Sequence, residues 1–260
     1  MSGRIEYKYL VPTSLIPKLR SEILPHVEPD MPPGDGLSAE YTVRSVYFDT
    51  PQFDCYEEKA DGLKLRNKFR VRGYGRGDSK SVVFLEIKRK NEAFIKKHRA
   101  PLAHEDLAAF FASRDIDRYI VGAPGQSREK EDALRFLYHY GRHGLRPTVL
   151  VVYDREAFKG RFDPSLRITF DKNVRGTPFP TLAELFDDQK LQVAMPGWFI
   201  FEVKFFRYAL PSWVRSVIAR YELPRLALSK YAICLEHTAD ADTSHWPRQR
   251  RMHSLLRTIA

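Results

Sequence analysis

The chain has 260 residues and a formal net charge of +10, with 43 Lys and Arg against 33 Asp and Glu. Hydrophobic residues make up 43% of it and aromatic residues 13%, which is enough for a sizeable core and argues against global disorder. No apolar run is long enough to span a bilayer, and the start MSGRIEYKYL lacks the apolar stretch of a secretory signal. Cys55 and Cys234 are the only cysteines and form no CxxC motif, so neither a disulfide scaffold nor a structural zinc site is expected. We therefore expect a reduced, cytoplasmic protein whose partner is an anion, such as nucleic acid, an anionic membrane surface or a phosphorylated small molecule.

Hydrophobic periodicity and turn residues predict a chain of mixed α+β class. In chain order the predicted elements are a strand at 4–11, a helix at 14–24, strands at 43–49, 64–73 and 81–90, helices at 104–113 and 127–141, strands at 148–158 and 165–172, a helix at 181–187, a strand at 199–207 and a helix at 211–222. GYGRGDS, residues 73–79, is typical of a hairpin connection and lacks the Gly-Lys-Ser/Thr ending of a P-loop. We expect one domain at 1–237 and a basic, flexible tail at 238–260.

One predicted strand, FIFEVKFF at 199–206, combines the composition of a buried strand with a glutamate and a lysine. Because side chains in a strand alternate between its faces, Glu202 and Lys204 point to one side and the phenylalanines to the other. The same alternation recurs along other predicted strands. It gathers onto single faces Arg4, Glu6 and Lys8; Lys64, Arg66, Lys68, Arg70 and Arg72; Glu86, Lys88 and Lys90; Tyr153 and Arg155; and Arg167, Thr169 and Asp171.

These charged faces have two interpretations. An antiparallel sheet with one face on a core and one in water gives the same alternation. A solvated face usually mixes its charges with Ser, Thr and Gln, however, whereas Arg and Lys dominate here, and like charges on adjacent strands repel each other. In a closed barrel the charged faces would line a lumen, where a polyanion would relieve the repulsion.

Seven segments occur in a characteristic order between about residue 4 and residue 236. They are RIEYKYLV, SVYFDTPQFDCYEEKADGLKLRNKFRVRGYG, VFLEIKRK, VVYDREAF, LRITFDKNVRG, FIFEVKF and LSKYAICLE. Together they resemble the VTC domain, the polyphosphate polymerase domain of the triphosphate tunnel metalloenzyme (CYTH-like) superfamily. The resemblance implies a closed antiparallel eight-stranded β-barrel, the triphosphate tunnel, with a cationic lumen and helices packed outside. Glu202 and Lys204 would then face the lumen.

The resemblance also implies roles for individual residues. Those that match catalytic positions of the family are Lys8, Arg70, Arg72, Lys88, Arg155 and Glu202. Those expected to contact phosphate or nucleotide are Lys97, with Lys96 as the alternative, and Tyr153, Arg167, Lys204, Ser229 and Lys230. Glu202 matches the carboxylate that would hold Mn²⁺ or Mg²⁺. The implied activity transfers the terminal phosphate of ATP to a growing inorganic polyphosphate chain.

One departure concerns the first strand. Many hydrolytic members of the superfamily begin with Glu-x-Glu-x-Lys, whereas Arg4 stands in place of the first glutamate here. The change weakens the case for a two-metal triphosphatase and adds a cation suited to a longer phosphate chain. Glu6 and Glu86 could position a metal or water, or form salt bridges, and Asp171 is expected to pair with an arginine.

Three alternatives to the polymerase follow from the same features. A tripolyphosphatase or nucleoside triphosphatase would share the tunnel and the metal. A non-catalytic module that binds polyphosphate would have little use for a buried carboxylate such as Glu202. A specific nucleic-acid binder is not expected, because the sequence has no helix-turn-helix, zinc-finger or RRM-like motif. The expected partners are ATP and inorganic polyphosphate, and the sequence carries no indication of oligomeric state.

Overall fold

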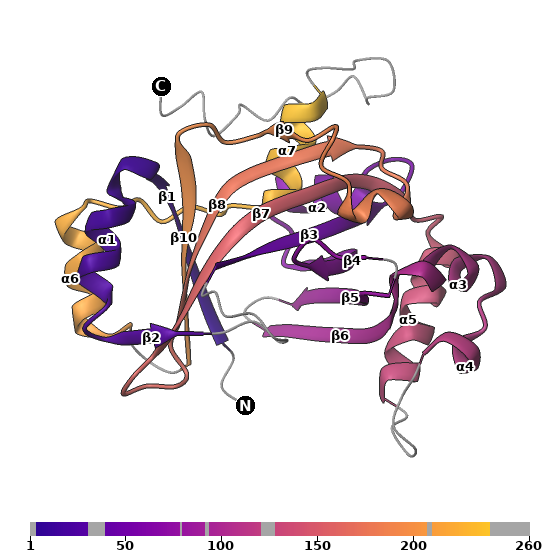
Figure 1. Ribbon diagram of the computed structural model, residues 1–260, viewed down its shortest axis with the longest axis horizontal. Helices are drawn as coiled ribbons and strands as arrows, with labels where there is room; N and C mark the ends of the chain where they lie inside the picture. Colours follow the sequence, from indigo (N-terminus) through magenta and orange to yellow (C-terminus); the bar gives the residue numbers. More distant parts are fainter. Residues whose placement is uncertain are drawn as a thin grey trace. The chain divides into compact units, whose positions relative to one another are not determined.

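The computed structural model describes residues 4–30, 40–78, 80–91, 94–120, 128–206 and 210–239 (Figure 1). Its strands are β1 (Arg4–Pro12), β2 (Val27–Pro29), β3 (Glu40–Asp49), β4 (Leu65–Tyr74), β5 (Val82–Asn91), β6 (Phe94–Ala103), β7 (Arg146–Gly160), β8 (Arg167–Pro178), β9 (Gln192–Val193) and β10 (Trp198–Phe206). Its α-helices are α1 (Ile16–Ile23), α2 (Asp54–Ala60), α3 (Leu107–Ser113), α4 (Ile116–Tyr119), α5 (Arg128–Arg142), α6 (Ser212–Arg220) and α7 (Lys230–Ala239). Short 3₁₀ helices are η1 (Thr13–Leu15), η2 (His104–Asp106) and η3 (Leu182–Phe186). The predicted α+β class is confirmed.

Every strand predicted from the sequence is present, with bounds shifted by a few residues. The helix predicted at 181–187 is a 3₁₀ helix, and the one predicted at 14–24 is divided into η1 and α1. The prediction missed β6, α2 and α7, and the short elements β2, β9 and α4. Helix α7 extends to Ala239, across the expected boundary at 237, and the predicted tail beyond it lies outside the described residues.

Hydrogen bonds join the strands in the order β1-β10-β8-β7-β3-β4-β5-β6, with β2 paired to β7 and β9 paired to β8. Eight strands thus form the main path, as expected for the tunnel fold. Among the described strands, however, this path has two ends, so the closed barrel that the sequence predicts is not formed by these pairings. A segment without regular structure covers the edge of β1 instead, where Leu226 N–H donates to Lys8 O (2.9 Å) and Arg225 bridges to Tyr9.

The chain forms two compact units made of non-contiguous segments. The first unit comprises 1–42, 153–174 and 195–229, and the second unit comprises 43–152, 175–194 and 230–260. Strands β7 and β8 each belong partly to the first unit and partly to the second.

The first unit has a core on one face of β1, β10 and the first half of β8. Helices α1 and α6 lie side by side there (Figure 1), and an ion pair between Arg220 and Glu22 joins them. Phe199 and Phe201 of β10 are fully buried against Leu19 of α1 and contribute to this core. Since apolar side chains alternate along β10, its other face is left for Glu202 and Lys204.

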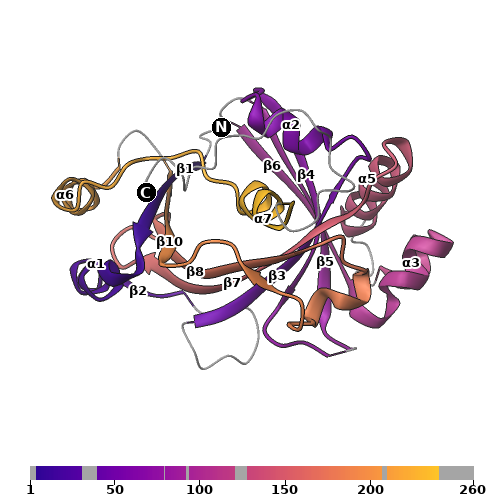
Figure 2. The same ribbon diagram turned by 90° about the horizontal axis from the view of Figure 1, so that it is seen from above.

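The second unit has its own core, between β3–β6 and helices α3 and α5. Helix α5 packs on β5 and β6 (Figure 2), and Phe136 from it meets Phe48 and Phe69 in edge-to-face contacts. The opposite face of the same strands carries charged side chains, among them Arg70, Glu86 and Arg99. Among the described residues, no helix is long and apolar enough to cross a membrane.

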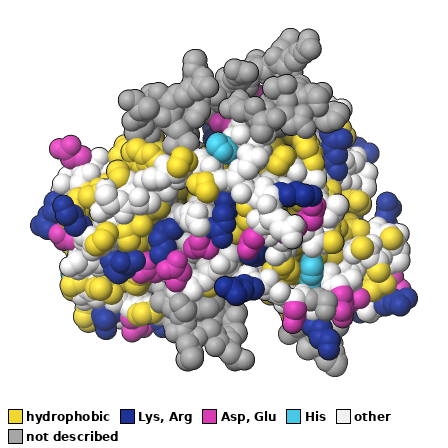
Figure 3. All heavy atoms as spheres, turned by 45° about the horizontal axis from the view of Figure 1, so that its top comes forward, with side chains coloured by type: hydrophobic (Ala, Val, Ile, Leu, Met, Phe, Trp, Pro, Cys, Tyr) yellow, Lys and Arg dark blue, Asp and Glu magenta, His cyan; other side chains and the backbone are white. Residues whose placement is uncertain are grey.

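On the face shown in Figure 3, Lys and Arg side chains are interspersed with Asp and Glu side chains. The net charge of +10 therefore forms no uniform basic patch on that face.

Candidate functional site

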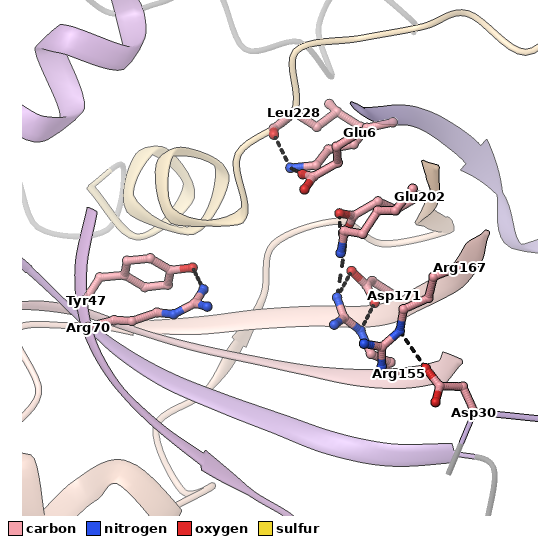
Figure 4. A network of polar contacts seen from close by, with 11 residues as sticks. Glu6, Asp30, Tyr47, Arg70, Arg155, Arg167, Asp171, Glu202 and Leu228 are labelled. Carbon is pink, nitrogen blue, oxygen red and sulfur yellow. Dashed lines mark hydrogen bonds and ion pairs between the residues drawn. The ribbon is translucent and has the colours of Figure 1, made fainter. Parts of the chain in front are cut away.

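The first unit places a set of charged residues on the polar face of β1, β10 and β8 (Figure 4). The antiparallel register sets Lys8 opposite Glu202, and Glu202 opposite Thr169. The next row sets Glu6 opposite Lys204, and Lys204 opposite Arg167. Directly opposite side chains in such pairs lie about 5 Å apart at Cβ, so each row is a contact surface and not a distant alignment.

Acids and bases in the first unit are closely paired. Lys204 Nζ lies 2.7 Å from Glu202 Oε1, and Arg155 Nη2 lies 3.9 Å from Glu202 Oε2. Arg155 also donates from Nε and Nη2 to both oxygens of Asp171, at 2.7 and 2.8 Å, and this bidentate pair confirms the expected arginine partner of Asp171. Glu202 therefore lies between two cations (Figure 4), while Asp171 fixes the guanidinium of Arg155.

The side chains at the edge of this group are held as well. Lys8 Nζ lies 2.9 Å from Glu6 Oε1 and donates to the carbonyl of Leu228 at 3.1 Å. Arg167 Nε lies 2.7 Å from a carboxylate oxygen of Asp30. The lysine and the arginine are thus oriented before any ligand arrives.

Burial changes the protonation of this group. Burial lowers the pKa of Lys204 to about 8, although Glu202 favours its charged form. Burial also opposes the charge of Arg155, but Asp171 outweighs it and raises the pKa of the guanidinium well above its usual value. Arg155 is therefore a permanent cation, whereas Lys204 can lose its proton at mildly alkaline pH.

The second unit has a comparable polar face on β3, β4, β5 and β6. One row of cross-strand neighbours is Tyr47, Arg70, Glu86 and Arg99. The adjacent row is Lys68, Lys88 and Lys97, a lysine from each of three neighbouring strands. Because Lys96 points to the other face of β6, alternation places Lys97 and not Lys96 beside these cations.

Glu86 organises the arginines of this face. Arg70 Nε donates to Glu86 Oε2 at 2.7 Å, Arg99 Nε lies 3.4 Å from Oε1, and Arg72 Nε lies 3.9 Å from Oε2. Burial opposes ionisation of Glu86, yet the charges of Arg70 and Arg72 lower its pKa to about 2. Of the roles considered for Glu86, the structure places it in salt bridges, and its partners are arginines and not a neighbouring lysine.

Tyr47 is a second partner of Arg70. Its phenol oxygen accepts a hydrogen bond from Arg70 Nη1 at 3.0 Å, and its ring stacks on Tyr231 with centroids 5.2 Å apart. Burial opposes ionisation of the phenol, but Arg70, Arg72 and Lys230 together lower the pKa of Tyr47. Lys230 at the start of α7 is therefore close enough to act on the same face.

Asp49 fixes the start of α7. The hydroxyl of Tyr231 donates to Asp49, which also accepts from the backbone N–H groups of Cys55 and Tyr56 at 2.9 and 3.0 Å. One buried carboxylate at the end of β3 thus caps α2 and anchors α7 next to Lys230.

A model of the VTC domain matches residues 3–238 of the chain. The chain belongs to the VTC domain family. A curated relative, Vacuolar transporter chaperone complex subunit 4 of Trypanosoma brucei brucei, is 27% identical over 153 residues, which are 51% of this chain. The chain spans only 19% of that relative. A similar solved structure is a Hippeastrum protein described as an adenylyl cyclase with a dominant triphosphatase activity; it has a TM-score of 0.46, 13% identity and coverage of 90% of this chain and 95% of that one.

Within this VTC domain the predicted site residues fall into two groups. The first unit contains Lys8, Tyr153, Arg155, Arg167, Glu202, Lys204 and Ser229. The second unit contains Arg70, Arg72, Lys88, Lys97 and Lys230. Tyr153 lies on the face of Arg155, whose guanidinium is 5.2 Å from the centroid of the tyrosine ring.

Sequence reasoning missed Tyr47 and Arg99. Arg99 lies over the ring of Phe84, 3.5 Å from its centroid, as well as beside Glu86. Its signal was the basic run IKKHR in residues 95–99, but that run was not recognised as a strand, so the pairing of Arg99 with Glu86 could not be seen.

The metal prediction concerns Glu202. Among the described residues, no group of three or more His, Cys, Asp or Glu side chains could hold a metal ion. Glu202 is 3% exposed and is contacted by Lys204 and Arg155. A single carboxylate fits Mg²⁺ or Mn²⁺ that arrives with phosphate oxygens and water as its other ligands, and does not fit a resident ion bound by protein alone.

Proposed function

We propose that this VTC domain is a metal-dependent phosphotransferase that passes the terminal phosphate of ATP to a growing inorganic polyphosphate chain bound on the cationic faces of its sheet. The observation that carries the proposal is the set of arginines fixed by carboxylates. Arg70, Arg72 and Arg99 are gathered around Glu86, and Arg155 is held by Asp171. Phosphoryl transfer depends on positioning and charge neutralisation more than on a covalent nucleophile, and such a set supplies both.

The arrangement of the cations favours a chain of phosphates over an isolated anion. Lys68, Lys88 and Lys97 occupy cross-strand positions on three adjacent strands, where like charges destabilise a sheet. A polyanion along the row would relieve that repulsion. Lysines suit this task as point charges, whereas arginine forks bind phosphate oxygens bidentately and set the geometry of the reacting group.

The arginines held by carboxylates would bind the phosphate oxygens. In the second unit Arg70, held by Glu86 and Tyr47, would bind phosphate oxygens in a fixed orientation, and in the first unit Arg155, held by Asp171, would do the same. Preorganised donors of this kind stabilise developing charge without reorganisation during the reaction. No general base is needed, because the accepting phosphate at the end of the chain is already ionised.

Glu202 would hold the Mn²⁺ or Mg²⁺ that accompanies the phosphates. When bound, the metal would supply positive charge that offsets the charge of the phosphates. Lys204, 2.7 Å from Glu202, would donate to a phosphate oxygen on the same face.

A hydrolase would share these features. Glu6 pairs with Lys8, and Glu86 with Arg70, just as Glu202 pairs with Lys204, so ion pairing does not separate the two reactions. Transfer is favoured over a two-metal hydrolysis because Arg4 stands in place of the first glutamate of the hydrolytic members.

The proposal is tested with the purified chain, ATP and Mn²⁺, with and without a short polyphosphate primer. Glu202→Gln is the test variant, and Glu28→Gln, whose carboxylate is exposed and pairs with Lys159, is the matched control. We expect stainable polyphosphate on a gel from the parent chain and from Glu28→Gln but not from Glu202→Gln. Free phosphate without polymer would assign a triphosphatase instead, and neither product would leave a polyphosphate-binding module.

A further inference from the structure

Thr169 of β8 is a buried polar residue with an unsatisfied hydroxyl. Thr169 is only 1% exposed, and its Oγ1 has no hydrogen-bond partner within the part of the chain that the structure describes. Burying a hydroxyl without a partner costs free energy, because it gives up its hydrogen bonds to water. Valine has the same shape and carries no such cost, so the hydroxyl is unfavourable here unless something binds to it.

The surroundings of Thr169 are charged. It lies between Arg167 and Asp171 on the polar face of β8, and it stands directly opposite Glu202 of β10. The Glu202 carboxylate is its nearest cross-strand neighbour and yet forms no hydrogen bond with it, since Glu202 faces Lys204 and Arg155. The neighbours of the hydroxyl thus include Arg167, which the family resemblance assigns to phosphate, and Glu202, which is proposed to hold the metal that accompanies phosphate.

A second donor lies on the same face. Arg167 Nε is buried and lies 2.7 Å from Asp30 as an ion pair, without the alignment of a hydrogen bond. Arg167 is two residues from Thr169 on the same strand, so both side chains point to one face. A group with several acceptor oxygens, such as a phosphoryl group, could accept from the Thr169 hydroxyl and face the Arg167 guanidinium.

We propose that Thr169 is a phosphate-binding residue whose hydroxyl donates a hydrogen bond to an oxygen of the bound phosphate chain. The inference rests on the proposed function only in requiring phosphate at this face, and it makes no use of phosphoryl transfer. Thr169 would fix the position of that oxygen between Arg155 and Arg167, which a charge alone does not do.

The test is isothermal titration of inorganic tripolyphosphate into the full chain, with EDTA present so that no metal contributes. The parent is compared with Thr169→Val, which keeps the shape and loses the hydroxyl, and with Thr169→Ser, which keeps the hydroxyl. We expect Thr169→Val to weaken binding about tenfold and Thr169→Ser to stay within about threefold of the parent. The melting temperature of ligand-free Thr169→Val should equal or exceed that of the parent, because the lost hydroxyl had no partner.

Four results would overturn the inference. Unchanged tripolyphosphate binding by Thr169→Val would mean that water satisfies the hydroxyl. Equal weakening in Thr169→Ser would assign the effect to packing, and an effect confined to a separate titration with Mn²⁺ alone would assign it to the metal. If Thr169→Val does not fold, Thr169→Ala takes its place. A parent chain that binds tripolyphosphate but makes no polymer would refute the proposed transfer and leave this test intact, whereas a parent that does not bind tripolyphosphate refutes both.

Discussion

Arg70 and Glu86 face each other across β4 and β5, with Arg70 Nε donating to Glu86 Oε2 at 2.7 Å. The same carboxylate faces Arg72 and Arg99, so one acid holds three guanidinium groups in place. A sheet face with so many cations would be unstable without it. Glu86 thereby connects the stability of the second unit to the geometry of its candidate phosphate-binding face.

Replacing Glu86 by Gln should destabilise the protein and weaken phosphate binding together. Removing one partner of a buried ion pair leaves the other charges uncompensated, and we expect a loss of about 3 kcal/mol in the free energy of unfolding. Urea denaturation measures it. Glu131→Gln is the control, because its carboxylate is 57% exposed and pairs with Arg135, and it should cost under about 0.5 kcal/mol. Equal losses in both variants would contradict the role given to Glu86.

Glu86 also predicts a pH dependence of stability. Its pKa falls from 4.5 to about 2 on folding, so the folded state favours the ionised carboxylate. The stabilisation is complete above pH 4.5 and is lost as the pH falls from there towards 2. Denaturation midpoints measured between these pH values should fall more steeply for the parent chain than for Glu86→Gln. Parallel curves would show that Glu86 does not titrate as described.

Tyr47→Phe should weaken phosphate binding with little effect on folding. The variant keeps the ring that stacks on Tyr231 but removes the oxygen that accepts from Arg70, leaving the guanidinium less well oriented. We expect tripolyphosphate to bind about threefold to tenfold more weakly, with a loss of unfolding free energy of about 1 kcal/mol. Tyr138→Phe, at an exposed position, is the control. Unchanged binding by Tyr47→Phe would remove Tyr47 from the site.

Tyr231→Phe should lower the free energy of unfolding more than it weakens phosphate binding, because Tyr231 anchors α7 through Asp49. A buried hydrogen bond to a charged group contributes roughly 2 kcal/mol, so the free energy of unfolding should fall by about that amount. Hydrogen exchange should show faster opening of α7 than in the parent. An α7 that exchanges as slowly as in the parent would show that other contacts hold it.

Lys97 and Lys96 offer a comparison within one strand. Lys97 shares its face with Lys88 and Arg99, whereas Lys96 shares its face with His98. Replacing Lys97 by Met should weaken tripolyphosphate binding about tenfold, and replacing Lys96 should leave it nearly unchanged. A larger effect at Lys96 would reverse the assignment.

Alternation along single strands made the polar faces predictable from the sequence, because a period of two is a local property that needs no knowledge of partners. Glu202 and Lys204 were read correctly as facing the same way for that reason. Contacts between distant parts of the chain were not predictable. Asp49 and Tyr231 are separated by 182 positions, and nothing in either local sequence indicates that the two residues are in contact.

The missed elements have physical reasons too. In β6, three cations and Pro101 interrupt the apolar alternation that marks a strand. In α7, Tyr231, Ala232, Cys234 and Leu235 are buried on one side, but the helix has only 10 residues, which is short for recognising a helical period. Barrel closure was an implication of the family resemblance, and the pairings of the described strands do not supply it.

The central claim is transfer of phosphate from ATP to polyphosphate, and the most direct measurement follows the γ-phosphate itself. The purified chain is incubated with ATP labelled with ³²P at the γ-position, Mn²⁺ and a short polyphosphate primer, and the products are separated by length. We predict that the label moves into chains longer than the primer, at a rate that falls sharply in Arg155→Met. Label found only in free phosphate, or remaining in ATP, would contradict the proposed function.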